Sequence, residues 1–473
     1  MAEKYDLVIL GAGTGGYTAA VHAAKLGMKT AVVEKGKTGG TCLHRGCIPS
    51  KAMLRSAEVY RQTKDAEQFG VTAENTSLDF RQVQKRKEEI VSRLHQGVES
   101  LMGHKNIDVY KGTGRILGPS IFSPVPGTIS VEYEEDKEND MLLPDNVLIA
   151  CGGSPNMLPG LIPDEDLILT SEGALGLKEL PSSITIIGGG AIGVEWASML
   201  VDFDVDVTLL ESAPGILPQE DKRVGEEMKR CLTSRGVKIH TSVQVKAEEI
   251  TKENGVTVPF DTENGSESVH AEKLLVSIGR KANLTNIGIE NTSIVIKDGF
   301  VEVNEWGQTK DRHIYASGDI TGGLQLAHAA SAEGITAVNH MAGNEPFPVK
   351  QNLIPRCIYS FPEAASIGLT EEQAEKAGYS VKTGHFPFKH NGKALVYGEE
   401  DGFVRFIADE KTDDLLGVHM IGPHVTELIS EASLAMLLDA AHFEVAQTIH
   451  PHPALSEASA EAAAAVSGRQ IHG

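Results

Sequence analysis

Two cysteines stand five positions apart in a glycine-rich stretch near the start of the chain. The stretch reads Gly39-Gly-Thr-Cys42-Leu-His-Arg-Gly-Cys47-Ile-Pro-Ser-Lys51. This spacing lets the two sulfurs meet in a small-loop disulfide, and the preceding glycines let the backbone approach a flat ring closely. The first chemistry that the sequence predicts is therefore thiol–disulfide exchange coupled to electron transfer.

A structural disulfide and half of a metal site are the alternatives for this pair. Zinc needs further thiolates or imidazoles nearby, whereas Cys151, Cys231 and Cys357 are scattered singly. Five cysteines in 473 residues do not make the disulfide framework of a secreted protein. In a reducing compartment the pair Cys42 and Cys47 would be catalytic, and no metal site is predicted.

A strand, a glycine turn and a helix precede the cysteines. Residues 5–10 read as a buried parallel strand, and the small residues of 17–26 predict a helix. Between them, Gly11 and Gly13 permit a tight turn beside a pyrophosphate, and Gly16 lets the helix pack on the strand. The next strand, residues 30–33, ends at Glu34, whose carboxylate is placed to accept hydrogen bonds from ribose hydroxyls.

The same pattern returns in the middle of the chain. The sequence predicts a strand at 184–187, followed by Gly188, Gly190 and Gly193 and by a helix that reaches residue 200. A second strand at 205–210 then ends at Glu211. In both copies the acid stands 23 positions after the first glycine. Two dinucleotides are therefore predicted, and the alternative is that one copy is a packing duplicate that has lost its ligand.

Glu211 also bears on the choice between NAD and NADP. A carboxylate at this position repels a 2′-phosphate, and no arginine follows it in Ser212-Ala-Pro-Gly-Ile-Leu-Pro. NAD is therefore favoured.

Two further motifs carry polar groups at the ends of apolar runs. The sequence of residues 313–319 predicts a strand that ends in Gly318 and Asp319. The Asp319 carboxylate either accepts a hydrogen bond from a cofactor hydroxyl, or Asp319 is an ordinary turn residue. In His450-Pro-His452-Pro453, the prolines hold His452 on an extended backbone, and Pro453 is suited to the start of a helix. Glu457 can then bind one ring nitrogen so that the other acts as a base, although a surface or core histidine is the alternative.

Composition narrows the class of protein. A formal charge of −22, from 43 basic and 65 acidic residues, disfavours nucleic acid and anionic membranes as partners. No apolar run reaches the length of a bilayer span, and the chain enters a strand almost at once, which leaves no room for a signal peptide. We therefore expect a large enzyme of roughly three domains that is cytoplasmic, the alternative being an organelle protein whose targeting segment has already been removed.

Taken together, the motifs resemble the flavin-dependent pyridine nucleotide-disulfide reductases over nearly the whole chain. The motifs that carry this resemblance are the two glycine turns, the stretch from Gly39 to Lys51, Gly193-Val-Glu195, Gly318-Asp319, Tyr359-Ser-Phe-Pro-Glu363 and the tail from His450 to Glu457. The H-x-H-P tail is similar to the lipoamide branch of the family.

The resemblance implies an α/β fold with two Rossmann-like dinucleotide-binding domains, for FAD and for NAD. It implies an FAD domain at 1–149 with the redox disulfide, an NAD domain at 150–275, a central domain at 276–347 that completes the FAD site, and a C-terminal α+β interface domain at 348–473. Residues 428–438 and 456–466 are expected to be interface helices of a homodimer, and 81–104 an amphipathic helix.

The resemblance also assigns roles to residues. It implies that Cys42 meets the substrate, that Cys47 faces the flavin, and that Lys51 near the flavin pairs with Glu195. Together with His452 and Glu457 these are the expected catalytic residues. The expected cofactor contacts are Gly11, Gly13, Thr14, Gly15, Gly16, Glu34, Lys35, Gly40, Thr41, Lys51, Gly114, Gly152, Asp319, Ala327, Gly188, Gly190, Ile192, Gly193, Glu211 and Gly279.

The implied reaction is oxidation of a protein-bound dihydrolipoyl group with reduction of NAD+. Its substrate would be the lipoyl domain of an acyltransferase or of a glycine-cleavage carrier, and the dimer would dock on a 2-oxo acid dehydrogenase core. The alternatives are a reductase of glutathione or another disulfide that uses NADPH, and a flavoprotein scaffold or redox sensor with a vestigial centre.

Overall fold

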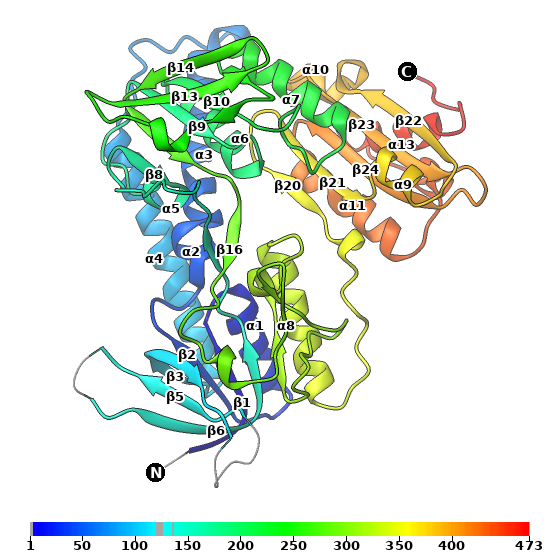
Figure 1. The fold of residues 1–473 in the computed structure, drawn as a ribbon. Helices are drawn as coiled ribbons and strands as arrows, with labels where there is room; N and C mark the ends of the chain where they lie inside the picture. Colours follow the sequence, from blue (N-terminus) through cyan, green and yellow to red (C-terminus); the bar gives the residue numbers. More distant parts are fainter. Residues whose placement is uncertain (1–2, 120–125, 135–136, 473) are drawn as a thin grey trace. The chain divides into compact units, whose positions relative to one another are not determined.

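The computed structural model of the chain describes residues 3–119, 126–134 and 137–472. These residues form two compact units, which Figure 1 shows as a ribbon. The first unit comprises Met1–Ala52, Gln82–Asn156 and Arg280–Gln351, and the second comprises Met53–Arg81, Met157–Gly279 and Asn352–Gly473. The four domain limits expected from the sequence stay a prediction.

A seven-stranded sheet forms the centre of the first unit. Five of its strands are parallel and stand in the order β3 (Asp108–Lys111), β2 (Thr30–Glu34), β1 (Glu3–Leu10), β6 (Asp140–Ile149) and β19 (Ile314–Ala316). Beyond β6 the strands β5 (Ile129–Glu132) and β4 (Thr113–Ile116) run antiparallel. Both apolar runs of this part of the sequence, residues 5–10 and 30–33, are thus buried strands.

The two faces of this sheet are covered differently. Alternate residues such as Leu7 and Ile9 pack against helices α1 (Thr14–Lys25), α4 (Phe80–His104) and α8 (Ala327–Met341). The other residues of β1, such as Val8 and Leu10, pack against β4, β5 and the segment around Val301. The period-two alternation of a strand thus builds two cores around one sheet.

The cysteine stretch forms two consecutive helices, α2 (Gly40–Arg45) and α3 (Cys47–Lys64). Gly46, between them, adopts an extended φ of −148°. The amphipathic helix predicted at 81–104 is confirmed as α4.

The second unit holds an all-parallel sheet of five strands. Its order is β11 (Lys238–His240), β10 (Asp206–Leu210), β9 (Ser183–Ile187), β15 (Lys273–Val276) and β8 (Ile168–Thr170). Helices α6 (Ala191–Asp202) and α7 (Lys222–Ser234) contact it, and β12 (Gln244–Val245), β13 (Val256–Thr262) and β14 (Gly265–Ala271) form an antiparallel sheet whose core is shared with the parallel one. This is the expected α/β arrangement around the second glycine turn.

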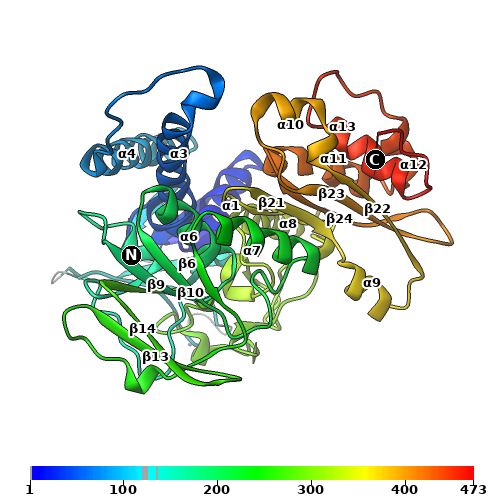
Figure 2. The ribbon, with the colours of Figure 1, turned by 90° about the horizontal axis from the view of Figure 1, so that it is seen from above.

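The C-terminal part of the second unit is an antiparallel sheet with helices against it (Figure 2). Its strands stand in the order β20 (Arg356–Ile358), β21 (Glu363–Gly368), β24 (Leu415–Gly422), β23 (Phe403–Asp409) and β22 (Val381–Pro387). Helices α11 (Val425–Leu437) and α13 (Glu457–Ala465) bury their apolar faces on it. Both predicted interface helices are therefore present, but the last one begins at Glu457, because residues 451–454 at Pro453 are not helical.

The remaining elements are short. They are β7 (Gly153–Pro155), β16 (Arg280–Ala282), β17 (Ile296–Lys297), β18 (Phe300–Val301), α5 (Ser171–Ala174), α9 (Glu371–Lys376), α10 (Gly392–Tyr397), α12 (His442–Gln447), and the 3-10 turns η1 (Ala66–Phe69), η2 (Ala247–Glu249), η3 (Ile289–Asn291), η4 (Gly318–Thr321), η5 (Gln351–Leu353) and η6 (Phe388–His390).

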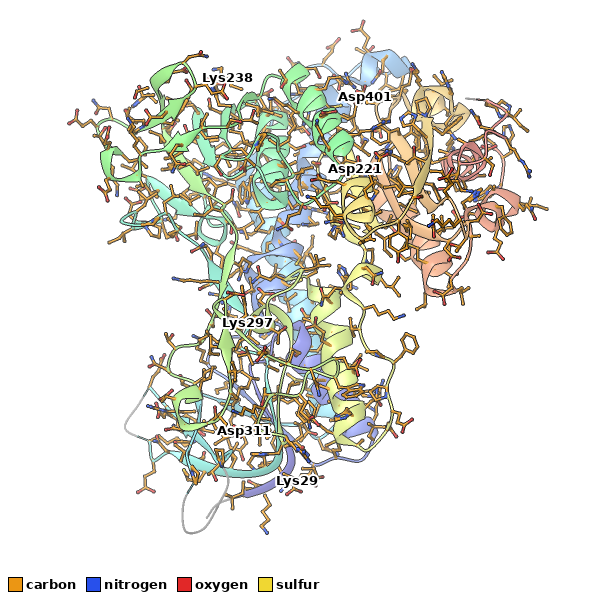
Figure 3. All side chains as sticks on the ribbon, turned by 45° about the vertical axis from the view of Figure 1, so that its right-hand side comes forward. Lys29, Asp221, Lys238, Lys297, Asp311 and Asp401 are labelled. Atoms are coloured by element: carbon orange, nitrogen blue, oxygen red, sulfur yellow. The ribbon has the colours of Figure 1, made fainter. Side chains whose placement is uncertain are left out.

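Two adjacent acids join the α7 region to the C-terminal sheet of the second unit. Asp221, labelled in Figure 3, caps α7 by accepting from the Arg223 N–H at 3.0 Å. Its other oxygen lies 2.7 Å from Nη1 of Arg405 on β23, and the two side chains are 4% and 1% exposed. Glu220 receives Nε and Nη2 of Arg356 on β20 at 3.0 and 3.2 Å. One buried arginine, Arg405, and one partly buried arginine, Arg356, thus hold this loop at two points.

Asp221→Ala removes the cap of α7 and one of the two acids that pair with Arg405, so that Glu371 is left as its carboxylate partner. We expect a loss of about 2 kcal/mol or more in the free energy of unfolding, because the cap and a charge-assisted hydrogen bond to a buried arginine are lost together. Urea denaturation followed by circular dichroism measures it. The control is Glu372→Ala, which breaks an exposed pair with Lys376 and should cost less than about 0.5 kcal/mol. Equal losses of unfolding free energy in the two variants would contradict a stabilising role for the contact between Asp221 and Arg405.

Candidate active site

The first glycine turn is shaped by close backbone contacts. Gly11 has a φ of +100°, and a Cβ on it would collide with the carbonyl of Ala150. A Cβ on Gly16 would collide with the Gly11 carbonyl, so α1 packs tightly on the turn. At Gly13, by contrast, the nearest protein atom would be 4.0 Å away, at Gly40. Space is therefore left at the position where a pyrophosphate approaches the helix N-terminus.

Glu34 ties the end of β2 to this turn. Its Oε2 accepts from the Ala12 N–H at 2.7 Å, and its Oε1 accepts from the Gly36 N–H at 2.7 Å. A carboxylate has about four acceptor positions, so both oxygens keep capacity for ribose hydroxyls. The neighbouring Lys35 is exposed.

The second glycine turn repeats this geometry. Gly188 has a φ of +106° against the Ser277 carbonyl, and a Cβ on Gly193 would collide with the Gly188 carbonyl. No atom lies within 4 Å of a Cβ built on Gly190. Glu211 is 8% exposed, and its two oxygens accept from the N–H groups of Gly189 and Ala213 at 2.6 and 2.7 Å. The two turns thus have matching cradles.

Ser277 is a residue of this turn that the sequence did not indicate. Its hydroxyl lies 3.2 Å from the carbonyl oxygens of both Ile187 and Gly188. It therefore braces the first glycine from the end of β15. The only available signal was its position at the end of an apolar run just before Gly279, whose φ is +97° with open space around it.

The two cysteine side chains are brought together. Both are thiols in the structure, and a hydrogen bond joins Cys42 to Cys47. This bond, burial and the charge of the neighbouring sulfur raise the pKa of Cys42, while Lys51 and a hydrogen bond with Thr14 act in the opposite direction. Because Thr14 is the first residue of α1, the dithiol lies directly beside the first glycine turn.

Cys47 differs from Cys42 in its place on the helices. It is the first residue of α3, which has 18 residues, and Lys51 follows one turn later on the same helix. The unpaired N–H groups at a helix N-terminus and a nearby cation both stabilise a thiolate. The geometry therefore favours Cys47 as the sulfur that carries negative charge.

Asp319 lies in η4, directly after β19, and pairs with Nε of Arg280 at 3.1 Å. Burial raises the pKa of Asp319, and Arg280 opposes the rise. The sequence did not predict Arg280 as its partner, nor Glu333, whose Oε2 accepts from the Gly318 N–H at 2.8 Å. Ala327 begins helix α8.

His452 is held by Glu457 as expected. Its Nδ1 lies 2.9 Å from Glu457 Oε1, and the other oxygen of Glu457 accepts from the Ala454 N–H at 2.8 Å. Burial tends to raise the pKa of Glu457, but these hydrogen bonds outweigh it and lower the pKa. The His452 side chain is 81% exposed, so Nε2 is accessible. His450, which was not singled out, is instead buried against Glu431 at 2.7 Å.

The other predicted residues lie as follows. Glu195 stands on α6 in the second unit, where its Oε1 accepts from the Tyr359 N–H at 3.0 Å, and Lys51 belongs to the first unit, so their pairing stays a prediction. Gly15 lies beside Ser317, whose buried hydroxyl has no partner among the described residues. Gly40, Thr41, Gly114, Gly152 and Ile192 are all partly exposed.

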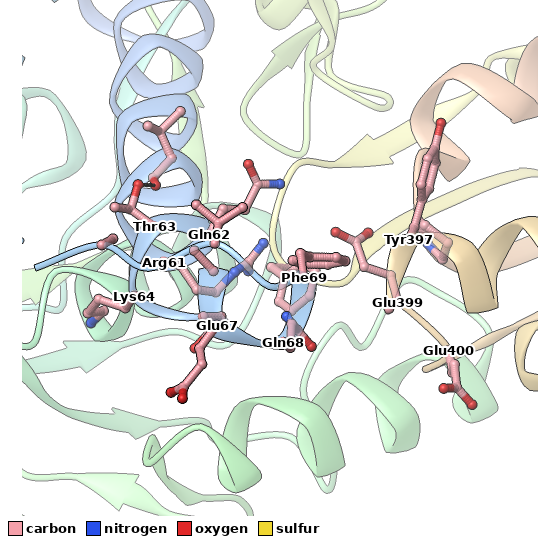
Figure 4. Close-up of a pocket in the computed structure, with 18 of the residues that line it drawn as sticks. Arg61, Gln62, Thr63, Lys64, Glu67, Gln68, Phe69, Tyr397, Glu399 and Glu400 are labelled. Atoms are coloured by element: carbon pink, nitrogen blue, oxygen red, sulfur yellow. Dashed lines mark hydrogen bonds between the residues drawn. The ribbon is translucent and has the colours of Figure 1, made fainter.

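These observations test whether two dinucleotides fit. The open positions at Gly13 and Gly190, and the unpartnered Ser317 hydroxyl in the first unit, are features that bound ligands would fill. A pocket of about 860 Å³ lies elsewhere, between the C-terminal half of α3, residues 65–73 and residues 397–401 of the second unit (Figure 4). The predicted site residues do not line that pocket.

Comparison with known families matches two models. Residues 5–334 match the pyridine nucleotide-disulphide oxidoreductase model, and residues 354–463 match the dimerisation domain of the same family. The chain therefore belongs to the pyridine nucleotide-disulphide oxidoreductase family. This membership confirms the predicted α/β fold class, the FAD and NAD cofactors, and the homodimer.

Curated relatives match over the full chain. A dihydrolipoyl dehydrogenase from Bacillus subtilis is 59% identical over 473 residues, with 100% of each chain covered. One from Zymomonas mobilis is 39% identical, again with 100% of each covered. The chain is thus similar along its whole length to enzymes of this name.

Solved structures agree with this grouping. LpdA from Mycobacterium tuberculosis superimposes with a TM-score of 0.89 at 26% identity, covering 98% of this chain and 99% of that one. The flavoprotein disulfide reductase RclA from Escherichia coli gives 0.84 at 28% identity, with 98% and 99% covered. Within the described residues, no helix is long and apolar enough to cross a bilayer.

Gly190→Ala tests the second glycine turn. The added methyl meets no protein atom within 4 Å, so the variant should fold and keep FAD. We expect NADH affinity to fall by about tenfold or more, because a methyl there blocks close approach of the pyrophosphate. Fluorescence titration with NADH measures it, and Gly97→Ala on exposed α4 is the control. Unchanged affinity would refute the proposed cradle.

Proposed function

We propose that this chain is a dihydrolipoyl dehydrogenase, which oxidises protein-bound dihydrolipoamide to lipoamide and reduces NAD+ to NADH. The observation that carries this proposal is that Cys42 makes hydrogen bonds both to Cys47 and to Thr14, the first residue of the helix that follows the first glycine turn. The relatives of the same name, matched along the full chain, support it. FAD and NAD, when bound, carry two electrons away from the dithiol.

The first step is proton transfer from the substrate to His452. Glu457 holds Nδ1, so Nδ1 carries the proton of the neutral ring and Nε2 is the base. A thiol of dihydrolipoamide gives its proton to Nε2, and the resulting thiolate attacks the Cys42 sulfur of a Cys42–Cys47 disulfide. A mixed disulfide forms, and Cys47 leaves as a thiolate.

The second step closes the lipoyl ring. The remaining substrate thiol attacks the substrate sulfur of the mixed disulfide, so that Cys42 leaves as a thiol after taking up a proton. The products are lipoamide and the reduced cysteine pair. The N-terminus of α3 and Lys51 stabilise the Cys47 thiolate, and Glu195 is assigned to orient Lys51.

The dimer completes the site in this proposal. His452 of one subunit serves the cysteines of the other, and the exposure of its ring, at 81%, suits such an exchange. The expected FAD contacts are those around Gly11, Glu34, Gly152 and Asp319, and the expected NAD contacts are those around Gly188, Glu211 and Gly279. The buried Glu211 carboxylate disfavours a 2′-phosphate and thus NADP.

The physiological partner belongs to the same proposal. The substrate is the lipoyl domain of an acyltransferase or of a glycine-cleavage carrier, and the dimer docks on a 2-oxo acid dehydrogenase core in the cytoplasm. A pull-down with candidate acyltransferase cores tests this part separately from the chemistry.

A direct assay separates the proposal from its alternatives. Purified enzyme is mixed with dihydrolipoamide and NAD+, and separately with oxidised glutathione and NADPH, while nicotinamide absorbance is followed. We expect turnover only with the first pair. Turnover with the second pair alone would indicate a glutathione-type reductase, and turnover with neither would indicate a vestigial redox centre.

His452→Gln should lower dihydrolipoamide oxidation by about 10²- to 10⁴-fold, because the base is lost. NADH-driven reduction of small dyes should persist, since it bypasses the thiol step. The matched control is His472→Gln, because His472 makes the same Nδ1 contact, 2.8 Å from Glu461 on α13. Equal loss of both activities would mean damage to the fold.

A further inference from the structure

Two histidines donate hydrogen bonds to one backbone carbonyl beside helix α2, which carries Cys42 and is called the redox helix below. Nε2 of His44 lies 2.8 Å from the carbonyl oxygen of Thr38, and Nδ1 of His95 lies 3.0 Å from the same oxygen. Since a carbonyl oxygen only accepts, each of these nitrogens must carry a proton and donate it. Thr38 is 4% exposed, so its carbonyl is satisfied by these two rings in the interior of the first unit.

The rings also hold one another. Their centroids are 4.9 Å apart in an edge-to-face arrangement. Burial lowers the pKa of His44, the hydrogen bond to Thr38 opposes this effect without outweighing it, and the neighbouring His95 lowers the pKa further. The His44 ring is thus favoured in its neutral form, with the proton on Nε2. The second nitrogen of His95 lies 3.5 Å from Glu99 on the same helix.

Helix α2, which carries Cys42, depends on such contacts. It has only six residues, and its N-cap, Gly39, supplies no side-chain hydrogen bond. A helix this short has little stability of its own, so tertiary contacts must place it. Gly39 and Gly40 have φ values of +105° and +64°, and the Gly39 N–H donates to the Ala12 carbonyl at 2.8 Å.

The Thr38 carbonyl lies immediately before this turn and is fixed from two sides. His44 belongs to α2 itself, two residues after Cys42, whereas His95 belongs to α4. The two hydrogen bonds therefore connect the end of the redox helix, its start and a long helix of the same unit. A shift of α2 would break at least one of them.

We propose that His44 and His95 are positioning residues for Cys42. Their shared hydrogen bonds to Thr38 hold α2 where the Cys42 sulfur meets Thr14 and Cys47, and so set the transfer of electrons from the dithiol. This rests on the proposed function in one respect, which is that Cys42 and Cys47 are the redox pair.

The test compares rings with and without a donor. His44→Phe and His95→Phe keep the aromatic contact but remove the hydrogen bond. His44→Gln and His95→Asn each place an amide nitrogen near the lost donor. The first readout is the ratio of iodoacetamide labelling at Cys42 and Cys47 in the reduced protein, mapped by mass spectrometry. The second is the long-wavelength absorption band that a Cys47 thiolate next to oxidised FAD would give. The third is the rate of flavin reduction by dihydrolipoamide.

We expect each phenylalanine variant to slow flavin reduction by about five- to tenfold, as for loss of one hydrogen bond. In the double variant the rate of flavin reduction should fall by more than the product of the two single-variant factors, because the Thr38 carbonyl then has neither donor. The labelling ratio and the band should change in parallel, and the amide variants should recover most of both. NADH-driven dye reduction should stay at the wild-type rate.

The control is His104→Phe, because His104 is exposed on α4 and, among the described residues, its Nδ1 is hydrogen-bonded to Ser100 in the preceding turn of the same helix. Wild-type labelling, band and reduction rate in both phenylalanine variants, even with a lower melting temperature, would overturn the proposal. If those variants do not bind FAD, His44→Glu is compared with His44→Gln, which has the same shape and a donor. Equal labelling ratios in that pair would also overturn it.

The outcome is separable from the proposed function. If the wild-type protein does not oxidise dihydrolipoamide, that function fails, while the labelling ratio and the band, generated with dithionite, still decide whether the histidines position Cys42.

Discussion

The close packing of one glycine on the carbonyl of another is the constraint on which the active site depends. Gly16 lies against the Gly11 carbonyl, and Gly193 lies against that of Gly188. Any side chain at these positions would push the helix off its strand. The packing brings the start of α1 beside the strand ends, and Thr14 at that start then reaches Cys42. The position of the Cys42 and Cys47 pair thus depends on a contact between backbones.

Much of this arrangement follows from local sequence. The strand at 5–10, the helix after Gly13 and the second copy around Gly188 combine short apolar runs with glycines at fixed intervals, and each signal lies within about 25 residues. The contact of His452 with Glu457 is also local. Only five positions separate the two residues, and the prolines on either side of His452 restrict its backbone. The last helix, expected at 456–466, begins at Glu457 and not at Pro453, since a proline is compatible with a first turn but does not require one.

Other parts of the site depend on long-range contacts that the sequence does not reveal. Ser277 braces Gly188 from a distant strand, and Arg280 meets Asp319 across 39 positions. His95 approaches Thr38 from a helix that reads only as an amphipathic surface element. The partners of these residues lie far away in the sequence, so only the folded backbone brings them together. The sequence thus predicts the chemistry better than the scaffold that holds it.

The double attachment of Glu211 has a consequence for engineering coenzyme preference. Its oxygens each receive a backbone amide, one from the glycine turn and one from the loop beyond the strand. Exchanging this acid for a residue suited to a phosphorylated ribose would therefore also release the glycine turn and the loop that its two oxygens hold. A redesign for the phosphorylated coenzyme would need a substitute acceptor for both backbone amides.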